Sequence, residues 1–467
     1  MQRYVLRMFA DEWRQWAPAI AVVAVISTMI GLCVHQFAWT TSPDFRAAVS
    51  GAGVPLAEFQ ILSVTIYTVI ALVSWVALTV VGRASIQATL RTHALWHLLG
   101  ASPRAVFLSA VLVLVIVSLC GAILGVASST LLGFWAVPAF NAAVSAAVDL
   151  PGFTIAVWAP AAIVVLSVLT AMVGGLMPAR RASRIPPGAA LRSPHAPDRR
   201  TFSTVLRVLS GLFFLVIAAA LVVASAFAEQ LGSTGPGPMF NLAINAGGSS
   251  LIAVYILCPE IVGGVLWLLH RLFASTGAVV PALGTRAAAA RAQVSATTIA
   301  PLAAGLGGIG LLLCAVNSVA AMTRILQPGI PTNLADVWTI VAVVAVSMLA
   351  TSAAVVALSA RGRGREIALL QAAGMHAGQV RLLIAAESFA MSVAAAVAAV
   401  LPVVTGGLVC AFVSAAALGD ASVVVWPLPS MLLGMLGSWL LLFIILVVPT
   451  IAPLRDGPGV RLREQGT

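Results

Sequence analysis

Long apolar segments separated by short polar joints follow one another along the whole chain. A helix that crosses a bilayer needs about 20 mainly apolar residues, because hydrocarbon offers no hydrogen-bond partner to an open backbone. This length rule predicts about ten spanning helices. They lie near residues 17–36, 58–82, 105–133, 154–177, 205–228, 247–273, 297–322, 336–360, 379–412 and 429–452. Pro259 and Pro402 interrupt the sixth and the ninth, where we expect kinks. The pattern predicts an all-α integral membrane protein.

Composition agrees with a membrane protein and excludes some chemistry. Of the 467 residues, 61% are hydrophobic and 8% are charged, against roughly a quarter charged in a soluble domain. All 25 basic residues are arginines. Without lysine the chain has neither a P-loop lysine nor a Schiff-base lysine. The five cysteines lie inside apolar segments, where a thiol behaves as a small hydrophobe.

The positions of the arginines predict the orientation in the membrane. They gather in both tails and in every second joint, whereas only Arg46 and Arg324 lie in the other joints. Positive charge near span ends is retained in the cytoplasm, so we expect both termini there. The net charge of +11 then reflects topology and attraction to anionic lipid, and it does not indicate nucleic-acid binding.

Two stretches near the ends of the chain repeat each other. "RTHALWHLLG" at 91–100 aligns without a gap with "REIALLQAAG" at 365–374. "PARRASRIPPGAALR" from Pro178 likewise aligns with "PTIAPLRDGPGVRLR" from Pro449. Both copies point the same way, unlike the inverted repeats common in ion-coupled transporters. We therefore predict two parallel four-helix repeats and two intervening helices. The predicted domains are 1–200, which includes a cytosolic linker, 201–275 for the intervening spans, and 276–467.

The stretch 365–374 predicts a short amphipathic helix at the inner membrane surface. Ile367, Leu370 and Gly374 share one apolar side, and Leu369 lies close to it. Such a helix rests in the interface with its polar side toward the cytosol. Two interpretations are open: a docking site for a motor protein, or an interfacial anchor that joins two spans.

These residues resemble the signature of FtsX-like permeases, the membrane subunits of type VII, mechanotransmitting ABC transporters. The resemblance rests on Arg365, Glu366, Ile367, Ala368, Leu369, Leu370, Gly374, Val380 and Glu387, and on the closing stretch from Pro178. The first copy is degenerate, with Thr92 and His93 opposite Glu366 and Ile367. Ten spans in two fused halves are similar to the permeases of bacitracin-type resistance. The outer loops here are short, whereas those relatives usually carry a large extracellular domain.

The resemblance implies a permease subunit without a nucleotide site, so ATP and Mg²⁺ would be bound by a separate ATPase. The implied cargo is an amphiphilic compound, such as an antimicrobial peptide, an antibiotic or a lipid-like molecule, that is exported or extracted at a bacterial plasma membrane. The residues predicted to couple to the ATPase are Arg91, Leu95, Leu98, Gly100, Arg365, Glu366, Leu369, Leu370 and Gly374. Two copies suggest two ATPase subunits per chain; alternatively, the first copy no longer docks, or two permease chains pair.

Charged residues within the predicted spans are further candidates, because an ionisable group in hydrocarbon is costly. Glu260 either marks a substrate path or is a protonated carboxyl bonded to backbone that Pro259 frees. Glu387 is predicted to support the structure by pairing with Arg381 or a neighbouring helix end. His93 and His97 have a spacing that zinc can use, but no third ligand stands nearby, so no metal site is predicted.

Two other classes of function compete with a transporter subunit. A permease-like scaffold could pass a signal to a membrane histidine kinase and transport little. An ion-coupled carrier would need intramembrane charge networks and inverted symmetry, and the sequence offers only Glu260 and Glu387 for such a network.

Overall fold

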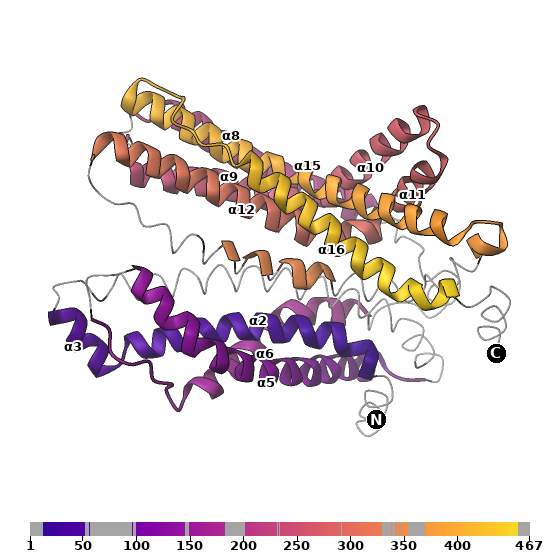
Figure 1. Ribbon diagram of the computed structural model, residues 1–467, viewed down its shortest axis with the longest axis horizontal. Coiled ribbons are helices and arrows are strands. Elements are labelled where there is room, and N and C mark those ends of the chain that lie inside the picture. Colours follow the sequence, from indigo (N-terminus) through magenta and orange to yellow (C-terminus); the bar gives the residue numbers. More distant parts are fainter. Residues whose placement is uncertain are drawn as a thin grey trace. The chain divides into compact units, whose positions relative to one another are not determined.

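The computed structural model describes residues 13–51, 56, 96, 100–144, 149–182, 201–230, 232, 234–290, 292–328, 338, 341–342, 344–346, 348–353 and 369–455. Every regular element in this part of the chain is an α-helix (Figure 1). The all-α fold predicted from the sequence is confirmed.

The chain forms two compact units. The first contains Met1–Ala196 together with Asn333–Leu358, and the second contains Pro197–Thr332 and Ser359–Thr467. These units are groups of packed segments and do not test the domain boundaries expected from the repeat, which stay a prediction.

The helices of the first unit are α2 (Trp13–Thr40), α3 (Pro43–Gly51), α5 (Pro103–Val144) and α6 (Ala159–Ala182). Helix α2 packs against both α5 and α6, which also pack against each other. Gly121 and Gly125 let α5 approach α2 closely, because a Cβ at either position would overlap Val23 or Ser27. Gln36 donates a hydrogen bond of 2.8 Å to the Oδ1 of Asn141 and joins the far ends of the same two helices.

The helices of the second unit are α8 (Thr201–Ala226), α9 (Pro236–Ile256), α10 (Cys258–Ser275), α11 (Val279–Ala290), α12 (Ala292–Leu326), α15 (Ala377–Leu418) and α16 (Leu428–Arg455). Helices α9, α12 and α15 pack against one another in its centre. Hydroxyl pairs add polar ties: Ser250 to Thr405 at 2.8 Å between α9 and α15, and Ser392 to Ser438 at 2.6 Å between α15 and α16.

Eight helices within the described residues are long and apolar enough to cross a membrane. They are Trp16–Thr40, Pro103–Ala139, Ala159–Leu176, Thr204–Ala226, Pro236–Ile256, Ile299–Leu326, Ala377–Leu418 and Leu428–Val448. The chain is thus a multi-pass helical membrane protein. The predicted second span, 58–82, lies outside the described residues, and the predicted span at 336–360 is described only in part, including the apolar helix Val344–Ala353.

The sixth span differs from its prediction. The sequence places it at 247–273, but the structure has a spanning helix from Pro236 to Ile256 and a separate helix, α10, from Cys258. The break falls at Leu257 because Pro259 lacks an amide hydrogen and favours the first turn of a new helix. The helix before the break, α9, begins at Pro236, directly after its N-cap residue Gly235.

Candidate functional site

The two repeated stretches end in the same backbone turn. Gly100 and Gly374 have φ angles of +87° and +95°, in the left-handed region that favours glycine. In each turn the backbone amide of the residue after the glycine donates a hydrogen bond to the carbonyl five residues earlier in the chain. The bond runs from Ala101 to Trp96 at 2.9 Å and from Met375 to Leu370 at 3.0 Å. This is the Schellman pattern that closes a helix, and it falls at aligned positions of the repeat.

The helices that follow the two turns also correspond. Helices α5 and α15 each have 42 residues and begin three residues after the closing glycine. Ser102 accepts a hydrogen bond of 3.3 Å from the amide of Ala105, and His376 together with Gln379 forms a capping box. Val106 and Val380, which align in the repeat, are both fully buried. Each turn is therefore joined tightly to a long helix of its unit.

The outer surface of the second turn is available to a partner. Leu369 is 54% exposed, and the glycine that ends the segment is exposed as well. The equivalent position to Leu370 in the first copy is Trp96, which packs against the core of its unit. Of the predicted coupling residues, Arg91, Leu95, Leu98, Arg365 and Glu366 lie outside the described residues. The coupling role stays a prediction.

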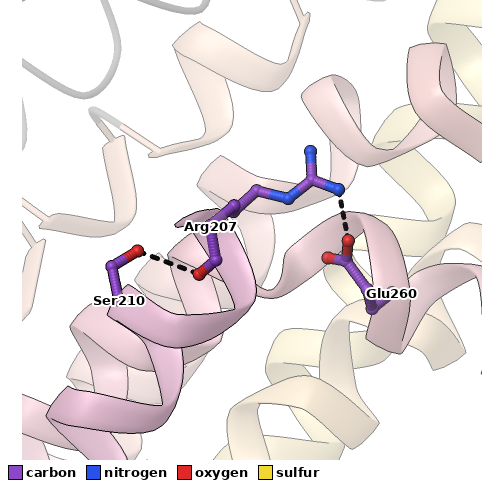
Figure 2. Close-up of polar contacts among 3 residues, drawn as sticks. All are labelled: Arg207, Ser210 and Glu260. Carbon is purple, nitrogen blue, oxygen red and sulfur yellow. Dashed lines mark hydrogen bonds and ion pairs between the residues drawn. The ribbon is translucent and has the colours of Figure 1, made fainter. Parts of the chain in front are cut away.

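An ion pair joins α8 to α10. Nη2 of Arg207 donates a hydrogen bond to Oε1 of Glu260 (Figure 2), and each side chain is 35% exposed. Ser210 also donates a hydrogen bond of 2.9 Å to the carbonyl of Arg207. Glu260 lies in the first turn of α10 and not in the middle of a span, because the sixth span has ended at Ile256. Its carboxylate therefore pairs with an arginine 53 residues away in sequence.

Burial next to this ion pair makes the neighbouring thiol inert. Cys258 is buried at the start of α10. Burial, and secondarily the charge of Glu260, raises the pKa of the Cys258 thiol to about 12. The thiolate is the reactive form of cysteine, so this side chain acts as a small apolar group.

Glu387 lies deep inside the second unit. It is 1% exposed and lies on α15, which packs against α11. Gly284 of α11 makes this approach possible, because a Cβ there would lie 2.9 Å from the carbonyl oxygen of Leu383. The aligned position in the first half is Val113, so the buried carboxyl belongs to the second half alone.

The sequence reasoning missed the hairpin of α10 and α11. Nδ1 of His270 lies 3.0 Å from the carbonyl oxygen of Ala282 and links the two helices. The signal in the sequence is the polar group Glu260, His270 and Arg271 within the predicted span 247–273. His93 and His97, with the spacing that zinc can use, lie outside the described residues.

Comparison with known proteins finds one family. Residues 64–187 match the model of the FtsX-like permease C-terminal family. The match falls on the first half, which carries the degenerate copy of the short helix, and includes α5 and α6. No curated protein and no solved structure matches the chain.

The fold and the match together define the class. The chain is a multi-pass helical membrane protein, and the match supports an FtsX-like permease, the membrane subunit of an ABC transporter. In that family the ATPase activity lies in a partner subunit, so the match also supports association with an ABC ATPase.

Proposed function

We propose that this chain couples ATP hydrolysis by a separate ATPase to the export or extraction of an amphiphilic compound, such as an antimicrobial peptide, an antibiotic or a lipid-like molecule. The family match over 64–187 supports the permease class. The observation that carries the coupling mechanism is the pair of identical glycine-closed turns, at Gly100 and Gly374, each joined to a long helix.

The ATPase docks on the stretch 365–374 and pushes on the start of α15. Leu369 offers an exposed apolar contact at this point. Helix α15 packs against α9, α12 and α16, so a push at its end moves a packed group of helices instead of bending one. Because the turn occurs twice, one chain offers a docking site to each of two ATPase subunits.

The proposal places the chain in a bacterial plasma membrane with both termini in the cytoplasm. The arginine distribution supports this orientation. ATP and Mg²⁺ bind to the partner, since this chain has no lysine for a P-loop. Apolar side chains cover the outside of the spans, for example Leu131, Leu212 and Leu433, so an amphiphilic cargo can reach the protein through the bilayer. A role for Glu260 in the cargo path stays a prediction.

Affinity purification of the full chain from its native membrane tests the proposal. We expect a P-loop ATPase to copurify in a ratio of two per permease chain. Leu369→Asp combined with Gly374→Pro is expected to abolish that association while membrane insertion is retained. Ala421→Asp, which adds the same charge in an exposed loop between α15 and α16, serves as the control.

Assays in vesicles separate transport from signalling. Substrate-stimulated ATP hydrolysis with measurable export supports the transporter. A copurifying histidine kinase without export would favour the sensory scaffold instead. An ATPase that binds equally well to the Leu369→Asp, Gly374→Pro variant would show that docking lies elsewhere.

A further inference from the structure

The α10–α11 hairpin lies between two candidate membrane spans of the second unit. It connects the spanning helix that ends at Ile256 to the one that begins at Ile299, and neither α10 nor α11 is among the candidate spans of the described chain. The two helices pack against each other and run at an angle to α9 and α12 (Figure 1). A helical connection between two consecutive spans is expected at the level of the lipid headgroups.

Each helix of the hairpin buries one face and exposes an apolar strip on the other. Helix α10 buries Cys258, Val262 and Leu266. On its opposite face Trp267, Leu268 and Leu272 are 55%, 59% and 58% exposed. At about 100° per residue, Arg271 lies between Trp267 and Leu268 around the helix axis and Leu272 lies beside Leu268, so the exposed side chains form one continuous strip.

Helix α11 shows the same arrangement. Gly284, Thr285 and Ala288 are buried, while Val279 and Leu283 are 68% and 45% exposed. Large apolar side chains exposed to this extent are unfavourable in water, so they need a cover. Acyl chains just below the headgroups provide that cover without a protein partner.

An exposed arginine accompanies each strip. The guanidinium of Arg271 lies over the ring of Trp267, 5.2 Å from its centroid, and Arg286 is exposed on the same face of α11 as Leu283. Tryptophan and arginine are the side chains that anchor helices at the headgroup level. Glu260 is the only acidic residue between 258 and 290, and it is paired with Arg207. The free charge of this surface is therefore positive.

The orientation of this surface is held by contacts at both ends of α10. The Arg207–Glu260 ion pair ties its first turn to α8, and His270 ties its last turns to α11. Gly284 seats α11 closely on α15. The two strips are therefore presented by a fixed scaffold.

We propose that the two exposed strips of the hairpin bind anionic phospholipid; they comprise Trp267, Leu268, Arg271 and Leu272 of α10, and Leu283 and Arg286 of α11. The arginines contact its phosphate, and the apolar side chains contact its acyl chains. The inference does not depend on the ATPase, and it adds a lipid site next to the α15 end on which the partner would act.

Native mass spectrometry of the full chain in detergent, titrated with phosphatidylglycerol or phosphatidylcholine, tests the proposal. We expect tighter binding of phosphatidylglycerol and a loss of roughly fivefold in affinity for each of Arg271→Gln and Arg286→Gln. Arg324→Gln, an exposed arginine at the end of α12, is the matched control and should change nothing. Inorganic phosphate should not compete, since it lacks acyl chains.

A second measurement leaves both arginines in place, so a folding defect of the arginine variants cannot affect it. Brominated phosphatidylglycerol should quench the fluorescence of the native chain more than that of Trp267→Phe. Equal affinity for the two lipids, unchanged binding in the Arg271→Gln, Arg286→Gln variant, or equal quenching of both proteins would overturn the lipid site.

Discussion

At the scale of single residues, Gly100 and Gly374 are two positions where the backbone conformation requires glycine. Both have a positive φ angle, and each is followed by an amide that bonds to the carbonyl five residues earlier. A side chain at either position would bring its Cβ against the following carbonyl. The sequence repeat preserves glycine at both positions even though other residues of the two copies differ.

Replacing Gly374 with alanine should destabilise the turn by about 1–2 kcal/mol, because the left-handed conformation brings the alanine Cβ too close to the following carbonyl oxygen. Gly374→Asn should cost less, since asparagine tolerates this conformation. Thermal unfolding of the purified chain, together with binding of the ATPase, measures both effects. Gly378→Ala, in open space in the first turn of α15, is the control. Equal melting temperatures for Gly374→Ala and Gly378→Ala would contradict the assignment.

The Arg207–Glu260 pair should contribute modestly to stability. Each side chain is about one-third exposed, so solvent screens the attraction. A double-mutant cycle with Arg207→Gln and Glu260→Gln should give a coupling energy of about 0.2–1 kcal/mol. Chemical unfolding in detergent measures it. Additive effects of the two substitutions would mean that the two side chains do not interact in solution.

At the scale of elements, close helix contact in the first unit depends on small residues. Between spanning helices in lipid, packing and hydrogen bonds replace the hydrophobic effect as the attraction. Gly125 of α5 meets Ser27 of α2 so closely that an added Cβ would lie 2.3 Å from the Ser27 Cβ and 2.9 Å from its carbonyl carbon. The second of these atoms is backbone, so a rotamer change cannot relieve the overlap.

Gly125→Ala should therefore lower the stability of the chain by about 1–3 kcal/mol through separation of α2 from α5. The melting temperature in detergent reports the loss. Gly437→Ala places the same methyl group on α16, where no heavy atom lies within 4 Å, and should leave the melting temperature unchanged or raise it. A Gly125→Ala variant as stable as Gly437→Ala would exclude the tight α2–α5 contact.

At the scale of the whole molecule, the two halves repeat one packing scheme. In the first unit α2, α5 and α6 pack pairwise, and in the second unit α12, α15 and α16 do the same. Additions distinguish the second unit: α8 and α9, the hairpin, and the buried Glu387 beneath α11.

The orientation can be tested by labelling single cysteines with a membrane-impermeant maleimide. Ser102→Cys and Ala372→Cys, next to the two closing glycines, should react only after the membrane is opened. Asp44→Cys and Ala421→Cys should react in intact cells. The unmodified chain serves as the blank, because four of its five thiols are buried. Labelling of positions 102 and 372 from opposite sides would refute the parallel repeat.

Features that depend on neighbouring residues could be predicted from the sequence, whereas features that depend on contacts between distant helices could not. Leu428–Val448 was predicted within a few residues, because apolar length is a local property. The break at Leu257 was placed inside a span, since Pro259 allows either a kink or a new helix and only packing decides between them. Glu260 was predicted as a candidate charge, but its partner Arg207 was not.

The sequence by itself determined that the chain is a helical membrane protein, that the stretch 91–100 recurs at 365–374, and that each copy ends in glycine. These features follow from hydrophobic runs and local backbone chemistry. Only the tertiary structure decided that residues 258–290 fold as a helical hairpin, that Glu260 pairs with α8, and that Glu387 is buried where α15 packs against α11. The physical reason is that each of these depends on contacts between helices far apart in sequence, and the apolar pattern that makes a helix does not specify which helix it meets.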